Sequence, residues 1–135
     1  MTGLVKGECM CGAVAYEATR LSDKVDACHC EQCRRWSGHF WASVNVKFSE
    51  LKFLKGEDRV RWYDSSEIVR RGFCEECGST LFWHSHRHPE YADLVGVSAG
   101  SLDAPTGVKL SVHIFVREKG DYYDLIDGLP QKPGH

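Results

Sequence analysis

Seven cysteines fall into three tight groups, and this grouping limits what the chain can fold into more than any other feature of the sequence. Within each group the thiols are one to two residues apart, so a turn can direct them onto a single cation that links distant chain segments. Because seven is an odd number, disulfides cannot use every thiol. The groups are Cys9 and Cys11, then Cys28, Cys30 and Cys33, and then Cys74 and Cys77.

The first and third groups are each followed by a glycine, Gly12 or Gly78, which can adopt the positive φ angles of a metal-binding knuckle. Four thiolates from these pairs would complete a tetrahedral zinc site, which is typical of a structural metal. The middle group lacks the glycine and supplies three thiolates, as in zinc sites that keep one position open for chemistry. The sequence therefore predicts two zinc ions per chain, one structural and one catalytic. The predicted ligands are Cys9, Cys11, Cys74 and Cys77 for the structural zinc, and Cys28, Cys30 and Cys33 for the catalytic zinc.

Other arrangements of the cysteines remain open at this point. Cys30 and Cys33 have the spacing to join Cys74 and Cys77 in an ordinary four-cysteine ribbon. A fourth protein ligand at the middle group would make that site structural as well. The candidate ligands are His29, His39, His84 and His113. A disulfide framework is the alternative without metal, and the run from His84 to His88 is more typical of the polar end of a strand than of a metal site.

Composition predicts one domain over residues 1–135, because the chain is too short for two independent cores. The formal net charge of −2 shows no basic excess, so neither nucleic acid nor a membrane is an expected partner. We found no stretch typical of a signal peptide or a membrane span, which favours a cytoplasmic protein whose thiols stay reduced. Residues from about 129 to 135 are expected to fray.

The remaining pattern predicts an all-β fold, with strand candidates about every 8–12 residues. Residues 51–54 and 60–63 flank Gly56-Glu57-Asp58, which indicates a hairpin. The one helical turn is expected over 31–36, beside the middle cysteines. The other strands are expected at 12–18, 24–27, 40–46, 68–73, 80–83, 91–97 and 112–116. Phe73, Phe82 and Phe115 are assigned to the core, whereas Trp36, Phe40, Trp41 and Trp83 are candidates for a pocket wall.

The cysteine groups and their flanks resemble the glutathione-dependent formaldehyde-activating enzyme family, whose domain also occurs in centromere protein V. The similarity extends over nearly the whole chain, and the full cysteine pattern is highly specific. The segments that carry it are Gly7–Val14, Cys28–Arg35, Phe73–Leu81, Gly100–Pro105 and His113–Val116.

This resemblance implies a β-tent-like fold with small antiparallel sheets around a structural zinc. It also implies the same division of the seven cysteines between two zinc ions, and carbon–sulfur lyase chemistry on glutathione and a small aldehyde such as formaldehyde. Arg34, Arg35 and Lys24 are candidates for attracting the carboxylates of glutathione. The family often has Trp after its last strand, where this chain has Asp121–Asp124, so its choice of substrate can differ.

Two other functions are compatible with the pattern. A non-catalytic zinc module would bind a protein or a nucleic acid, although this chain lacks the extended basic tail that would favour that function. A redox or zinc-storage protein would use the middle thiols as nucleophiles. The sequence leaves the oligomeric state open, with a dimer through an edge strand as one arrangement.

Overall fold

The computed structural model describes residues 3–135, so the first two residues of the predicted domain lie outside the described part. Strands dominate this part of the chain, which confirms the all-β prediction. The strands are β1 (Leu4–Glu8), β2 (Ala15–Thr19), β3 (Lys24–Cys28), β4 (Trp41–Lys47), β5 (Lys52–Lys55), β6 (Val60–Asp64), β7 (Arg70–Cys74), β8 (Thr80–His84), β9 (Leu94–Ser98) and β10 (Lys109–Ile114). The α-helix is α1 (Glu31–Ser37), and four 3₁₀ turns cover Phe48–Glu50, Glu57–Arg59, Ala99–Ser101 and Val116–Glu118.

The strands form two sheets. A three-stranded sheet has the order β1-β2-β5, and a seven-stranded sheet has the order β10-β3-β4-β9-β8-β7-β6. All neighbouring strands are antiparallel except β3 and β10, which run parallel. The predicted hairpin of residues 51–54 and 60–63 is wrong, because β5 pairs with β2 while β6 pairs with β7. The connection around Gly56 therefore passes from one sheet to the other.

The main hydrophobic core lies between the two sheets. Alternating residues Val5, Tyr16 and Ala18 of β1 and β2 are buried, as the period of two in a half-buried strand requires. They pack with apolar residues of the larger sheet, among them Val44, Val46, Leu81, Phe82, Val95 and Val97. The rings of Tyr16 and Phe82 meet edge to face, with centroids 5.3 Å apart. This core holds the β7–β8 hairpin beside the β1–β2 hairpin.

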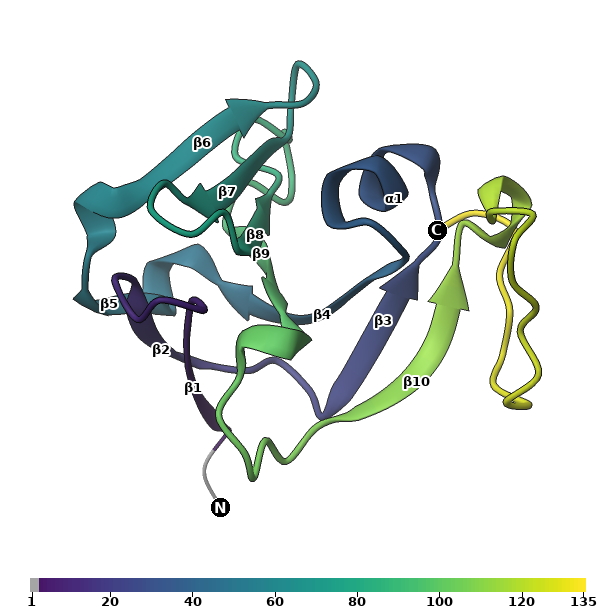
Figure 1. Ribbon diagram of the computed structural model, residues 1–135, viewed down its shortest axis with the longest axis horizontal. Coiled ribbons are helices and arrows are strands. Elements are labelled where there is room, and N and C mark those ends of the chain that lie inside the picture. The colour runs from purple at the N-terminus through teal and green to yellow at the C-terminus, as the bar shows by residue number, and fades with distance from the viewer. Residues whose placement is uncertain (1–2) are drawn as a thin grey trace.

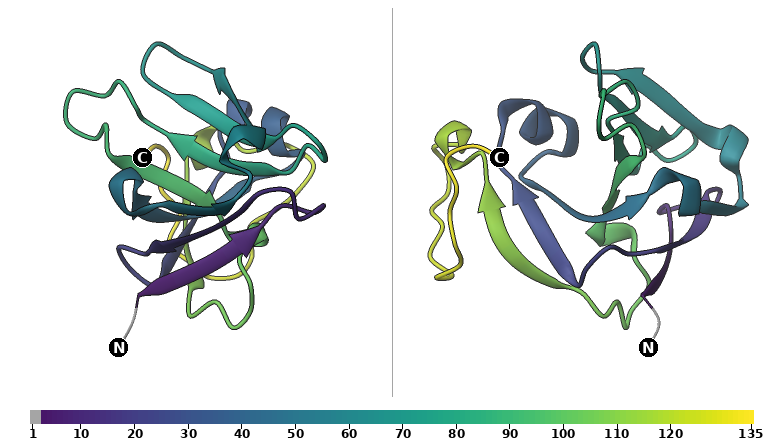
Figure 2. Two further views of the ribbon diagram at one scale, coloured as in Figure 1. Left: turned by 90° about the vertical axis from the view of Figure 1, so that its left-hand side faces the viewer. Right: turned by 180° about the vertical axis from the view of Figure 1, so that it is seen from behind.

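The larger sheet curves, and α1 lies above β4 between the β6–β8 end and the β3–β10 end (Figure 1). The helix begins directly after β3 and ends at Gly38, whose φ of 88° allows its N–H to bond to the Arg34 carbonyl at 2.8 Å. It matches the predicted turn at 31–36 to within one residue. The view from behind in Figure 2 shows the same separation of the two ends of the sheet.

The C-terminal residues lie along β10 instead of fraying. The His113 N–H donates to the Pro130 carbonyl, the Lys132 N–H donates to the His113 carbonyl, and the Phe115 N–H donates to the Gly134 carbonyl, all at 2.8–2.9 Å. Composition alone could not reveal these partners, because the backbone N–H and C=O groups of an edge strand can pair with a segment of almost any sequence. The last segment is visible beside β10 in Figure 1.

No helix within residues 3–135 is both long enough and apolar enough to cross a membrane.

Candidate metal centres

Two hairpin turns bring four sulfurs together next to the main core. Cys9 follows β1, Cys74 ends β7, and the Sγ atoms of Cys9, Cys11, Cys74 and Cys77 all lie within 4.8 Å of one another. Gly12 and Gly78 have φ angles of 80° and 79°, so each knuckle uses the backbone freedom that its glycine predicts. The alternative ribbon that pairs Cys30 and Cys33 with Cys74 and Cys77 is not formed.

The separations within this group fit a tetrahedral metal. Sγ of Cys11 lies 3.7 Å from that of Cys9 and 3.9 Å from that of Cys74. Four sulfurs around zinc at about 2.3 Å would lie about 3.8 Å from one another. The N–H of Val14 points to Cys9 Sγ at 3.3 Å, and that of Glu76 to Cys74 Sγ at 3.4 Å, so backbone donors offset negative charge on the sulfurs. The four sulfurs therefore have the donor chemistry and the spacing of a zinc–thiolate site.

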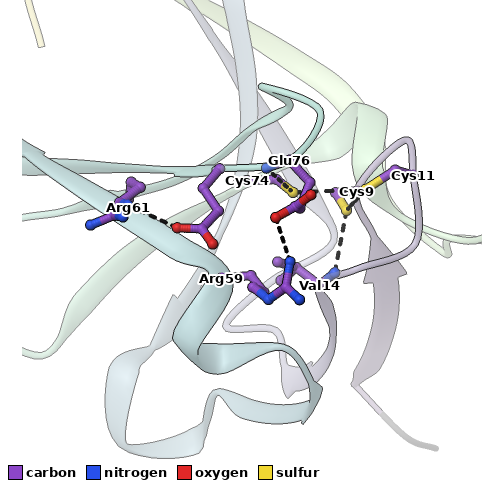
Figure 3. A network of polar contacts seen from close by, with 8 residues as sticks. Cys9, Cys11, Val14, Arg59, Arg61, Cys74 and Glu76 are labelled. Atoms are coloured by element: carbon purple, nitrogen blue, oxygen red, sulfur yellow. Dashed lines mark hydrogen bonds and ion pairs between the residues drawn. The ribbon is translucent and has the colours of Figure 1, made fainter.

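Ion pairs hold the second knuckle from outside. Arg59 pairs with Glu76, and Arg61 Nε lies 2.8 Å from Glu75 Oε1, so β6 is tied to the turn between β7 and β8 (Figure 3). These pairs are largely exposed, and each contributes little to stability. The stability of the four-cysteine group therefore depends more on its sulfurs than on these two ion pairs.

The second cysteine group comes from one continuous segment. Cys28 ends β3, Cys30 caps α1 by accepting a hydrogen bond from the Cys33 N–H at 3.3 Å, and Cys33 is buried in the first turn. Their three Sγ atoms lie within 4.8 Å of one another. Hydrogen bonds from Cys28 and Cys33 lower the pKa of the Cys30 thiol, whereas hydrogen bonding to Cys30 raises the pKa of Cys28. The cluster therefore favours a thiolate at Cys30 even before a cation is considered.

No histidine or carboxylate within residues 3–135 joins this three-sulfur group. His29 is completely buried, but its ring hydrogen-bonds the Tyr123 hydroxyl at 2.6 Å and His113 at 2.8 Å. His113 in turn bonds to Asp127 at 2.8 Å. Burial and the neighbouring His113 lower the pKa of His29 to about 4, so its ring is neutral at pH 7.

The other two candidate ligands are also engaged elsewhere. His39 hydrogen-bonds the Tyr122 hydroxyl at 2.7 Å, and His84 bonds to Arg70 and to the Ala92 carbonyl. His84 and His86 lie near each other, with ring centroids 5.6 Å apart, but they form no ligand group with a third His, Cys, Asp or Glu among the described residues. All seven cysteines are free thiols in the structure.

A cavity of about 420 Å³ opens beside the three sulfurs. This volume lies within the range of small-molecule sites, about 300–1,000 Å³. Trp41 and Trp83 line it, as the sequence suggests, whereas Trp36 packs behind Trp41 with ring centroids 5.1 Å apart, and Phe40 packs on His29. Cys28, Cys30 and Cys33 all face the cavity, so a molecule inside it reaches the sulfurs.

Phe115 is a cavity residue and not part of the main core, which corrects the expectation from sequence. It has a φ of 55°, a left-handed conformation that is uncommon for a bulky residue, and it is only half-buried. Of the other two phenylalanines assigned to the core, Phe82 is completely buried there, whereas Phe73 is only partly buried, like Phe115, and lies outside the main core cluster.

Among residues 3–135, Arg71 is the one lysine or arginine that lines the cavity, and no sequence motif distinguishes it. Lys24, Arg34 and Arg35 do not line the cavity: Arg35 pairs with Glu31 on the surface, and Arg34 Nε donates to the carbonyls of His29 and Glu118. Arg71 extends from β7 to α1, where its Nη1 lies 3.4 Å from Cys33 Sγ. Arg70 and Arg71 are adjacent residues of the same type, so sequence alone does not show which of them faces the cavity.

Comparisons with known proteins identify the family of this chain. An uncharacterized lyase of Schizosaccharomyces pombe is 27% identical over 122 residues, which cover 89% of this chain and 84% of that protein. Two further fungal proteins are provisionally named glutathione-dependent formaldehyde-activating enzymes, and each is 28% identical. The match covers 75% of this chain and 60% of the protein from Talaromyces marneffei, and 62% of this chain and 41% of the protein from Podospora anserina.

A crystal structure of a Rhodobacter sphaeroides protein superposes with a TM-score of 0.62 at 26% identity, over 73% of this chain and 88% of that one. The family model described as "Glutathione-dependent formaldehyde-activating enzyme" matches residues 4–118, which include both cysteine groups. The chain therefore belongs to the glutathione-dependent formaldehyde-activating enzyme family, a family of lyases.

Proposed function

We propose that the chain is a zinc-dependent carbon–sulfur lyase that forms or cleaves the S-hydroxymethyl adduct of glutathione, or of a similar thiol, with formaldehyde or another small aldehyde. The observation that carries this proposal is the group of three sulfurs on the wall of a cavity, with no histidine or carboxylate of residues 3–135 among them. Family membership supports the reaction class.

In this proposal the two cysteine groups have separate roles. Cys9, Cys11, Cys74 and Cys77 hold a structural zinc, because four thiolates complete its coordination. Cys28, Cys30 and Cys33 hold a catalytic zinc, which supplies deprotonation of a thiol and a fixed position for it. The 3.7 and 3.9 Å sulfur separations in the first group and the shared three-sulfur geometry of the second support these assignments.

The residues around the three sulfurs position that chemistry. The Cys30 cap and the first turn of α1 fix the segment that carries all three thiols, and the His29–His113–Asp127 hydrogen bonds fix its rear side. Trp41 and Trp83 supply large apolar surfaces to the cavity wall. Holding the thiol beside the aldehyde makes the addition effectively unimolecular, so orientation supplies much of the rate gain.

The addition itself balances without an oxidant or a reductant. The thiolate sulfur attacks the carbonyl carbon, a C–S bond forms, and the electron pair of the C=O π bond moves to oxygen. The thiol releases its proton to solvent when the thiolate forms, and solvent returns one proton to that oxygen to give the S-hydroxymethyl adduct. Cleavage is the reverse of these steps, so one site performs both directions.

Exchange spectroscopy tests the proposal. NMR of a mixture of formaldehyde and glutathione measures how fast the free thiol and its adduct interconvert. The zinc-loaded wild type is expected to accelerate this exchange, and Cys30→Ser is not. Equal rates for the two proteins would reject the proposal and favour a non-catalytic zinc module that binds another macromolecule.

A further inference from the structure

Two buried N–H donors on the cavity residues have no hydrogen-bond partner. Within residues 3–135, four buried side-chain nitrogens lack a partner, and two of them are Trp41 Nε1 and Arg71 Nε. Both side chains line the cavity that holds the three sulfurs, and they are only 5% and 4% exposed. Because buried donors are nearly always hydrogen-bonded, two orphaned donors in one cavity wall indicate a missing acceptor.

The surroundings of Arg71 hold its guanidinium at the reacting end of the cavity. Three residues of α1 contact it: Nη1 lies 3.4 Å from Cys33 Sγ, Nη2 lies 3.3 Å from Gln32 Oε1, and its Cζ lies 5.0 Å from the centre of the Trp36 ring. Trp36 also packs against Trp41. The Trp36 ring therefore contacts both Arg71 on β7 and Trp41 on β4, two strands of the same sheet that β9 and β8 separate.

The charge of Arg71 has no carboxylate to balance it. No carboxylate of residues 3–135 forms an ion pair with this side chain. Burying a cation is costly unless it is paired and hydrogen-bonded. Asp26 and Glu118 also line the cavity, and Glu118 Oε1 accepts a hydrogen bond from the Glu31 N–H at the start of α1, but neither carboxylate pairs with Arg71. Cys33 Sγ balances part of this charge, and the orphaned Nε is left for another anion.

We infer that Arg71 and Trp41 bind the oxygen that becomes negatively charged when the thiol adds to the aldehyde. This assignment rests on the proposed function and identifies Arg71 as a catalytic residue. Both orphaned nitrogens are covered by protein atoms, so the oxygen reaches them through a side-chain adjustment. Donors directed at a developing oxyanion lower the barrier most in a buried site with little water.

The position of Arg71 favours the reacting oxygen over a carboxylate of the thiol substrate. Its guanidinium touches a sulfur of the cluster, and the oxygen of the adduct is only two bonds from the substrate sulfur. The carboxylates of glutathione are several bonds farther away. A zinc ion with its three thiolates would carry a net charge of −1, so an alkoxide formed beside it would still be repelled, and a cation at this point stabilises the reacting state selectively.

Formate, a small anion with the size of the aldehyde, tests the site without turnover. In the zinc-loaded wild type, formate is expected to shift the NMR signal of the Trp41 indole N–H in a saturable way. In Arg71→Met, which keeps the apolar stem, formate affinity should fall about tenfold or more because a charge-assisted hydrogen bond is lost. Arg61→Met removes an exposed arginine outside the cavity and should bind formate as the wild type does. Unchanged affinity in Arg71→Met would overturn the inference.

A second variant decides the matter if Arg71→Met does not fold. Trp41→Phe keeps the ring and removes only the indole N–H. Formate should then bind several-fold more weakly, as followed by the Nε–H signal of Arg71. An unaltered formate affinity in Trp41→Phe would exclude Trp41 from the site. An Arg71 Nε–H signal that formate does not shift in the wild type would exclude Arg71.

Kinetics with two thiols identify which oxygen is bound. Arg71→Met should lower kcat for formaldehyde about 100-fold with either glutathione or 2-mercaptoethanol, with KM changed much less. A loss seen with glutathione alone, mainly in KM, would assign Arg71 to a substrate carboxylate and overturn the inference. If the wild type accelerates neither reaction, the proposed function fails, while the formate titration still reports on the anion site.

Discussion

The four-cysteine group joins two hairpins whose cysteines lie 63 positions apart, at Cys11 and Cys74, whereas the three-cysteine group comes from a single strand–helix junction. The first group lies against the main core, so a metal there would link distant segments. The second lies at a cavity, and its backbone is already fixed by β3, α1 and the His29–His113 pair. In the proposed function, the same ligand type therefore contributes to stability in one region and to chemistry in the other.

The largest expected effect is loss of the fold when the four-cysteine group is broken. Cys77→Ser removes one ligand from a structural zinc, whose apparent binding free energy is about 10–16 kcal/mol. This matches or exceeds the net stability of a typical domain, about 5–15 kcal/mol. Circular dichroism at 25 °C should show an unfolded protein. A variant that melts at the wild-type temperature would show that the two groups do not differ in this way.

Cys30→Ser is the matched change in the other region. The protein is expected to fall from about two zinc ions to about one, to keep its fold, and to lose thiol–aldehyde exchange. Elemental analysis and a thermal melt measure the first two properties. Loss of both metals, or of the fold, would refute the assignment of the seven cysteines to separate sites.

A smaller effect is expected from His113→Ala, which leaves His29 without its buried partner. The segment that carries Cys28 and Cys30 should then be held less firmly, and zinc affinity at the three-cysteine group should fall about tenfold. Chelator competition measures each site, and the four-cysteine affinity should be unaffected. His88→Ala, on a loop outside both groups, is the control; an equal change in both variants would exclude a specific role for the His29–His113 pair.

The smallest effect concerns a buried histidine away from both groups. Burial lowers the pKa of His84, so the folded state keeps the ring neutral where the unfolded chain, with an ordinary pKa of about 6.5, binds a proton. Its contribution to stability is present above that pH and is lost as the pH falls below it. Between pH 7 and 5, the free energy of unfolding should decline less steeply in His84→Gln than in the wild type, by up to about 1.4 kcal/mol per pH unit. Chemical denaturation at several pH values measures both slopes, and identical slopes would contradict this.

Local sequence signals predict the parts of this molecule that local interactions determine. Gly12 and Gly78 take the positive φ angles that their knuckles require, and the helical turn begins at the expected position, Glu31. The clustering of the sulfurs into a group of four and a group of three also follows from local signals, because each pair with a glycine forms its own turn.

Features set by long-range packing could not be predicted in this way. Residues 51–54 and 60–63 look like a hairpin locally, but the buried faces of β5 and β6 belong to different sheets. Arg70 and Arg71 are adjacent in β7 and therefore point to opposite faces of the sheet. Only the pairing of β7 decides which of the two side chains faces the cavity. Arg70 lies over the Trp62 ring at 3.9 Å, whereas Arg71 reaches Cys33.

The central claim is that the three-cysteine group, and not the four-cysteine group, accepts a thiol from solution. Cadmium-113 NMR of protein loaded with this zinc substitute reports the two sites as separate signals. One equivalent of glutathione is expected to move one signal, the one absent from Cys30→Ser, and to leave the other in place. Two unchanged signals, or a shift of the signal that Cys30→Ser retains, would contradict the account.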